Sequence, residues 1–186
     1  MLQYVVVACL LCFLVNGDLA KPGEITEKKI CLRSNEHSTC FCPYQNKPLQ
    51  TFSFWNADKE VRQFTQTCEP INLSFYEDTC KIYPVNPDGE TEYEYVCPYN
   101  GFLQTWGAFA PASGNFSIRL WFRCCEVECP KWNCMWSPFS ETKKEFLIPL
   151  KDAFATGTRG RYVHEDKDSA WSMKICQCDF SSREEL

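Results

Sequence analysis

Cysteine is the residue type in this sequence that could do the most chemistry. The 186 residues include fourteen cysteines, and twelve of these follow residue 17. Sulfur serves redox catalysis, metal binding or disulfide formation, and the first two favour Cys-x-x-Cys pairs. No such pair occurs among the twelve, since Cys40 and Cys42, like Cys176 and Cys178, are separated by one residue. We therefore expect disulfides and no metal site.

A short apolar run lies near the start of the chain. Residues 5–15 are all apolar and include Cys9 and Cys12. A run of this length matches the hydrophobic region of a secretory signal peptide and is too short to span a bilayer. We expect residues 1–17 to be removed during export to the extracellular space, where disulfides persist. No later run is long enough to predict a membrane span.

Residues that could catalyse a reaction are few. The only histidines are His37 and His164, and the sequence contains neither a Gly-x-Ser-x-Gly nor a His-Glu-x-x-His motif. Asp166 and Asp168 could form a catalytic pair or bind calcium, but a solvated turn explains them more simply. The net charge of −5 and the lack of a basic stripe argue against nucleic acid as a partner. We expect neither enzyme activity nor a cofactor.

Two stretches of the chain are similar to each other. Cys42-Pro-Tyr-Gln-Asn is followed by Leu49-Gln-Thr-Phe, and Cys97-Pro-Tyr-Asn-Gly is followed by Leu103-Gln-Thr-Trp. Each stretch then reaches an element that ends in cysteine, and residues 168–176 form a third such ending. The spacing indicates an internal repeat of about 55 residues.

The residues before these cysteines alternate between apolar and mixed side chains. Phe116, Ile118, Leu120 and Phe122 occupy every second position, which is the period of a β-strand. Glu90, Glu92 and Glu94 alternate with Thr91, Tyr93 and Tyr95, which predicts a strand with one face in water. We expect an all-β, disulfide-rich single domain of three pseudo-repeated units, closed as a β-prism-like or β-trefoil-like arrangement that hides sheet edges.

The expected organisation has four segments. A signal peptide at residues 1–17 precedes an N-terminal segment at 18–41, the repeat-containing domain at 42–180 and an acidic tail at 181–186. Asn72 and Asn115 each begin an Asn-x-Ser sequon, which predicts glycosylation in an exported protein.

One candidate binding site lies in the predicted strand before the Cys-Cys pair. Trp121 stands between Arg119 and Arg123 on the mixed face, where it could stack on a sugar ring while the arginines bind sulfate or carboxylate groups. The alternative is that Trp121 packs against the next unit. Arg159 and Arg161 form a small basic loop in this interpretation, which could also help to bind acidic glycans.

Several of these motifs together resemble the dermatopontin family. The matching runs are Cys97-Pro-Tyr-Asn-Gly-Phe-Leu, Arg119-Leu-Trp-Phe-Arg-Cys-Cys, Cys129-Pro-Lys-Trp-Asn-Cys-Met-Trp and residues 168–178. Members of that family carry repeated Trp-containing elements that run into cysteine, with a Cys-Cys pair after the middle copy. The resemblance covers residues 40–180.

The resemblance implies a disulfide pairing. Because Cys124 and Cys125 are adjacent on a strand, their side chains point to opposite faces and should have different partners. The implied pairs are Cys42–Cys68, Cys80–Cys124, Cys97–Cys125, Cys129–Cys178 and Cys134–Cys176, which leaves Cys31–Cys40 as an added pair.

The resemblance also implies a function without catalysis. Members of the family associate with collagen fibrils and small proteoglycans in the extracellular matrix and support cell adhesion. We therefore expect matrix proteins, proteoglycans or glycans as partners. Invertebrate relatives include carbohydrate-binding agglutinins, so a lectin acting in innate defence is the alternative.

Overall fold

The chain folds into antiparallel β-strands. The computed structural model describes residues 26–30, 32–33, 37–42, 46–57, 61–85, 92–109 and 119–180. The strands in these ranges are β1 (Thr26–Ile30), β2 (Leu32–Arg33), β3 (His37–Phe41), β4 (Asn46–Asn56), β5 (Val61–Pro70), β6 (Phe75–Pro84), β7 (Glu92–Val96), β8 (Phe102–Phe109), β9 (Arg119–Val127), β10 (Lys131–Trp136), β11 (Phe146–Pro149), β12 (Phe154–Val163) and β13 (Asp168–Asp179). No helix occurs in the described ranges, and the all-β prediction is confirmed.

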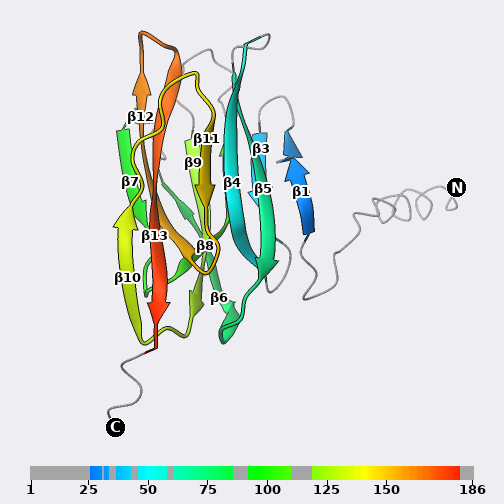
Figure 1. Cartoon of the computed structure of the whole chain (residues 1–186), viewed down its shortest axis with the longest axis vertical. Helices are drawn as coiled ribbons and strands as arrows, with labels where there is room; N and C mark the ends of the chain where they lie inside the picture. The colour runs from blue at the N-terminus through cyan, green and yellow to red at the C-terminus, as the bar shows by residue number, and fades with distance from the viewer. Residues whose placement is uncertain are drawn as a thin grey trace, which may run out of the picture.

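The strands form three sheets (Figure 1). Sheet A has the order β1-β5-β4-β11, sheet B the order β2-β3-β8-β9-β6, and sheet C the order β10-β13-β12-β7. A hairpin of two consecutive strands lies inside each sheet, namely β4–β5, β8–β9 or β12–β13. The number of sheets equals the expected number of units, while the three pseudo-repeated units and their closed arrangement stay a prediction.

The connections between the sheets follow one pattern. We divide the chain into thirds that each end in one of these hairpins: β1–β5, β6–β9 and β10–β13. The second strand of each hairpin pairs with the first strand of its own third, which is β1, β6 or β10. The first strand pairs with a strand from another third, because β11 joins β4, β3 joins β8 and β7 joins β12. Each third of the chain therefore contributes to a sheet built on another hairpin: the first gives β2 and β3 to sheet B, the second gives β7 to sheet C and the last gives β11 to sheet A.

A register shift occurs in the first strand of every hairpin. The shifts fall between Pro48 and Gln50 in β4, between Leu103 and Thr105 in β8, and between Ala155 and Gly157 in β12. Such bulges bend and twist a strand. Both Leu-Gln-Thr sequences lie at these shifts, so the sequence similarity coincides with an irregularity in the backbone.

The main core lies between the three sheets. Leu120, Phe122 and Cys124 of β9 are buried in it, while Trp121 and Arg123 lie on the other face of the strand, as period two predicts. Sheets A and C reach the same core through other aromatic side chains. Phe64 of β5 contacts the rings of Trp106 at 4.7 Å and Trp171 at 5.5 Å, both edge to face. One apolar core thus joins the sheets.

A buried lysine fixes the turn after β11. The side chain of Lys47 is 6% exposed, and its Nζ donates to the carbonyl oxygens of Leu150 at 3.1 Å and Ala153 at 2.7 Å. It also forms an ion pair with Glu69 of β5. The ammonium group is therefore satisfied by two carbonyls and a carboxylate, as a buried charge requires.

Five disulfides join cysteines in the described part of the chain. They join Cys42 to Cys68, Cys80 to Cys125, Cys97 to Cys124, Cys129 to Cys178 and Cys134 to Cys176. The first and the last two are pairs that the family resemblance implied. Cys31 and the side chain of Cys40 lie outside the described residues, so their bond stays a prediction.

The partners of Cys124 and Cys125 are the reverse of the implied ones. In the register of β6 and β9, Lys81 lies opposite Cys124, so Cys80 points to the same face as Cys125. The Cα atoms of Cys80 and Cys125 are 4.0 Å apart. Cys124 faces the main core, where Cys97 lies at the end of β7. The adjacent cysteines do take different partners, but the assignment Cys80–Cys124 and Cys97–Cys125 was wrong.

Candidate functional site

Trp121 packs on its own sheet. It is half-buried on the outer face of β9 and lies opposite Gly107 of β8 in the strand register. The indole ring covers this glycine so closely that a Cβ atom at position 107 would overlap the Cε2, Cζ2 and Nε1 atoms of the ring. Of the two predictions for Trp121, the structure agrees better with packing. The ring packs on the neighbouring strand β8, however, and not on another unit.

Arg123 is held within the same sheet. Its guanidinium donates to Oε1 of Gln104, which is 1% exposed, and lies 3.5 Å from Oε1 of Glu77. The side chain of Arg119 and the whole of Asn115 lie outside the described residues. Of the three residues predicted to bind a ligand, the structure thus places Trp121 and Arg123 on one face, each with an intramolecular contact.

The contact between Trp121 and Gly107 gives a stability prediction. Gly107→Ala should lower the free energy of unfolding by about 1–3 kcal/mol, because the new methyl group overpacks against the indole ring. In a Trp121→Ala background the same change should cost less than about 0.5 kcal/mol, since the ring is gone. Urea unfolding of the two single variants and the double variant measures the difference. Equal costs in both backgrounds would show that the ring does not constrain Gly107.

Asp166 and Asp168 hold the turn that precedes β11. The hydroxyl of Thr142 donates to Asp166. The backbone N–H groups of Lys143 and Ser169 donate to the Asp168 carboxylate at 2.7 and 2.8 Å. Across the described part of the chain, no group of three or more His, Cys, Asp or Glu side chains is arranged to hold a metal ion. These two carboxylates have structural partners.

A second basic pair lies on the outer face of sheet C. Arg159 and Arg161 lie in strand β12, so the expectation of a loop was wrong. The Arg159 guanidinium lies 4.6 Å from the ring centroid of Trp136 and 4.8 Å from that of Phe139. Arg161 lies 4.9 Å from the same Phe139 ring. We call these four residues, Trp136, Arg159, Phe139 and Arg161, the arginine–aromatic stack.

The segment that carries Phe139 is anchored to β13. Backbone N–H groups of Ser137 and Ser140 donate to the carbonyl oxygens of Met173 and Trp171 at 2.8 and 2.7 Å. In return, the hydroxyls of these serines accept bonds from the N–H groups of Met173 at 3.0 Å and Trp171 at 2.9 Å. Four hydrogen bonds therefore hold the position of Phe139 beside β12.

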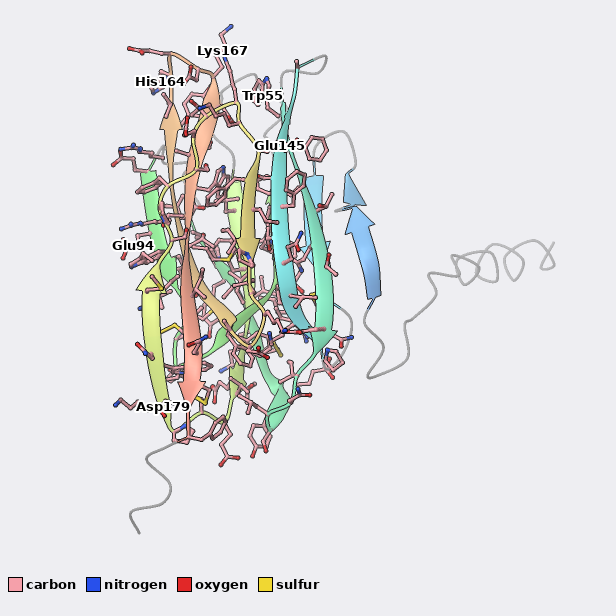
Figure 2. The ribbon with its side chains drawn as sticks, viewed as in Figure 1. Trp55, Glu94, Glu145, His164, Lys167 and Asp179 are labelled. Atoms are coloured by element: carbon pink, nitrogen blue, oxygen red, sulfur yellow. A yellow bond between two sulfur atoms is a disulfide. The ribbon has the colours of Figure 1, made fainter. Side chains whose placement is uncertain are left out.

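Acidic residues flank the stack on β7. Glu94 lies opposite Arg159 and Glu92 opposite Arg161 in the strand register, and both glutamates are exposed. Figure 2 shows Glu94 on the side of β7 that faces away from the core. No ion pair within 4.0 Å joins these carboxylates to the two arginines. Both guanidinium groups contact aromatic rings, and Nε of Arg159 also donates to Oγ of Ser172 at 3.3 Å. A guanidinium stacked on a ring can still donate N–H groups from its edge.

The other face of β7 points inward. Tyr93 and Tyr95 alternate with the exposed glutamates, as the sequence pattern predicts, whereas Glu90 lies outside the described residues. The Tyr93 hydroxyl lies 3.2 Å from Oγ1 of Thr158, and burial holds its pKa well above the usual value. Burial, with a smaller effect of Tyr83, raises the pKa of Tyr95 to about 12. Both phenols stay protonated at neutral pH.

Only part of the arginine–aromatic stack could be predicted from the sequence. Arg159 and Arg161 were noted as a basic pair, and their spacing of two residues is that of one face of a strand. Trp136 and Phe139 lie more than 19 residues earlier in the chain, and only the pairing of β10, β13 and β12 brings them to the arginines. Tertiary contacts of this kind leave no local pattern.

Comparisons with known proteins place no further constraint on this site. No family model, curated protein or solved structure matches the chain. In the part of the chain that the structure describes, no helix is long and apolar enough to cross a membrane. The class that the fold defines is an all-β protein, and the five disulfides among its described residues are consistent with an extracellular location.

Proposed function

We propose that this chain is an exported, non-enzymatic protein of the extracellular matrix, related to dermatopontin, that binds acidic matrix glycans through the outer face of sheet C. The observation that carries the proposal is the arginine–aromatic stack, in which two guanidinium groups contact Phe139 at 4.8 and 4.9 Å. Such a surface offers both cationic donors and aromatic carbon to a ligand.

The stack suits sulfate and carboxylate groups. Arginine binds these anions through paired N–H donors, and the aromatic contacts hold each guanidinium in place before a ligand arrives. The two arginines are two residues apart on one strand, which spaces their Cα atoms by roughly 6.6 Å. A glycan with a repeated negative charge could contact both at once.

Other features support an extracellular role. Five disulfides stabilise the described strands, and proteins with this density of bonds occur in oxidising compartments. The apolar run at residues 5–15 favours export. Association with collagen or small proteoglycans, and a role in adhesion, follow from the family resemblance.

Arg159→Gln is expected to weaken binding to heparan sulfate and dermatan sulfate at least tenfold. The variant removes the guanidinium that contacts both Trp136 and Phe139. Arg159→Lys should also weaken binding, because an ammonium keeps the charge but cannot donate two parallel N–H bonds. Surface plasmon resonance on immobilised glycans, repeated from 50 to 500 mM NaCl, measures the affinities, which should fall with salt.

Arg123→Gln provides the matched control. It removes an arginine from the outer face of sheet B whose terminal Nη1 and Nη2 atoms already contact Gln104 and Glu77, whereas Arg159 donates to Ser172 through Nε. We therefore expect less than a twofold change. Equal losses for Arg123→Gln and Arg159→Gln would contradict the assignment of the site to sheet C. Agglutination of cells that a simple sugar abolishes, without binding to sulfated glycans, would favour the lectin alternative.

A further inference from the structure

A cavity lies between the three sheets. All of them contribute to its lining, through Phe64 and Ile148 of sheet A, Trp106 and Phe122 of sheet B, and Trp171 and Met173 of sheet C. The empty space is about 480 Å³, a figure that includes the opening to solvent. Cavities of this size are typical of sites for small molecules, and the enclosed part suits one compact group such as a ring.

Aromatic rings line the opening of the cavity. Phe64, Phe146 and Trp171 pack against the main core but stay partly exposed. Other lining residues, such as Trp106 and Phe122, are buried. This difference indicates that the three partly exposed rings lie toward the opening and that buried side chains form the floor. The opening gives a ligand a path from solvent into the core.

One polar group of the lining has no hydrogen-bond partner. The indole Nε1 of Trp171 is buried, and no acceptor lies within reach of it among the described residues. By contrast, Nε1 of Trp132 donates to the carbonyl oxygen of Asn100 at 3.1 Å. A buried N–H group without an acceptor is rare in proteins, because it has lost its hydrogen bond to water and gained none. The Trp171 donor is therefore available to a ligand that enters the cavity.

Neighbouring rings hold this indole in place. The ring centroids of Phe64 and Tyr93 lie 5.5 and 5.9 Å from that of Trp171, both in edge contacts. The Tyr93 hydroxyl is in turn 3.2 Å from Oγ1 of Thr158, which is another residue of the lining. The Nε1 donor is thus fixed before a ligand arrives, which lowers the entropic cost of binding.

The lining also limits the charge of the ligand. Among the described residues that line the cavity there is no lysine, arginine, histidine, aspartate or glutamate, and the polar ones carry hydroxyl groups, as Thr51 and Thr158 do. A carboxylate or ammonium group would lose its hydration here without gaining an opposite charge. A neutral carbonyl oxygen avoids this cost and can accept the indole N–H bond. The surrounding rings favour an aromatic ligand, which packs on them by edge contacts.

We infer that the cavity binds a small neutral aromatic molecule with one carbonyl oxygen. The ring of the ligand lies among the apolar side chains, and its carbonyl oxygen accepts the hydrogen bond from Nε1 of Trp171. Thr158 lines the cavity, whereas Arg159, the next residue of β12, lies on the outer face of sheet C. The site therefore uses none of the residues of the arginine–aromatic stack, and it does not depend on that proposal.

Acetophenone and ethylbenzene are matched probes, because a CH₂ group in the second replaces the carbonyl group of the first. In NMR titrations of the oxidised, ¹⁵N-labelled protein, acetophenone should bind with a Kd below about 1 mM and move the Trp171 indole N–H resonance downfield. Ethylbenzene should bind about fivefold more weakly, because it accepts no hydrogen bond. Benzoate, which is charged at neutral pH, should bind at least tenfold more weakly than acetophenone.

Three variants separate the donor from the space. Trp171→Phe keeps a ring but removes the N–H group, so it should lower the affinity for acetophenone about fivefold and leave that for ethylbenzene within twofold. Trp132→Phe is the matched control, because Trp132 lies outside the lining and its Nε1 has an acceptor, and it should change neither affinity more than twofold. Ile148→Phe keeps the indole and fills the cavity, so it should weaken both probes at least tenfold, and it decides the matter if Trp171→Phe does not fold.

The outcomes distinguish this inference from the proposed function. Wild-type protein that binds neither probe, or Trp171→Phe protein that still prefers acetophenone, would overturn the site whatever happens with sulfated glycans. Ile148→Phe protein that binds both probes normally would also overturn it, and so would failure of this variant to fold, because the cavity would then have no room for a ring. Arg159→Gln should leave acetophenone binding within twofold of wild type.

Discussion

Replacing both Cys97 and Cys124 with alanine is expected to lower the free energy of unfolding by about 3.5 kcal/mol. The bond closes a loop with a sequence separation of 27, and the estimate is the entropy that such a loop loses in the unfolded chain. Both sulfur atoms belong to the main core, so the cavity left by two alanines should add to the loss. Urea unfolding under non-reducing conditions measures the change.

The same double variant tests the pairing itself. If Cys97 bonds to Cys124, then removing both leaves the bond between Cys80 and Cys125 intact, and thiol titration of the unfolded protein should detect no new free thiol. The reversed pairing would leave two cysteines without partners. Cys97→Ala with Cys125→Ala is the matched control, because it should break two bonds and destabilise the protein more.

Lys47→Ala is expected to cost about 3–5 kcal/mol of stability. The change leaves Glu69 and the carbonyl oxygens of Leu150 and Ala153 without the ammonium group that they contact. Removing one member of a buried ion pair has a cost of this size, because the remaining charge is poorly solvated. Equilibrium unfolding in urea at pH 7, with all disulfides oxidised, measures it.

Lys144→Ala is the control for a surface pair. Lys144 forms an ion pair with Glu141 three residues earlier, but both side chains are more than 60% exposed. Water screens such a pair, so the expected change is below about 0.5 kcal/mol. Similar losses for Lys47→Ala and Lys144→Ala would show that burial of Lys47 does not govern its contribution.

The strand content of this fold was accessible from the sequence because side-chain alternation is local. Phe122 and Tyr95 lie on the inner faces that period two predicts. The choice of partner for Cys124 was not accessible, because it depends on the register of β6 against β9 and a bulge between Tyr76 and Lys81 alters that register. The pairing that the family resemblance implied named the cysteines that form bonds, but it exchanged the partners of Cys124 and Cys125.

The candidate site was less accessible than the fold. Trp121 and Arg123 were the natural choice from sequence, since a tryptophan between arginines is visible in a short window. Gly107, which receives the indole ring, and Phe139, which contacts two arginines, come from distant parts of the chain. The internal repeat stays a prediction, although the recurring connections and register shifts agree with it.

The pairing of strands from different thirds of the chain has a consequence for biosynthesis. Sheet A cannot be completed until β11 has been made, because β4 pairs with that late strand. Until then, one edge of β4 is open to strands of other nascent molecules, which is a route to aggregation. A chain that ended prematurely before residue 146 would keep this open edge permanently, so even late truncations should misassemble.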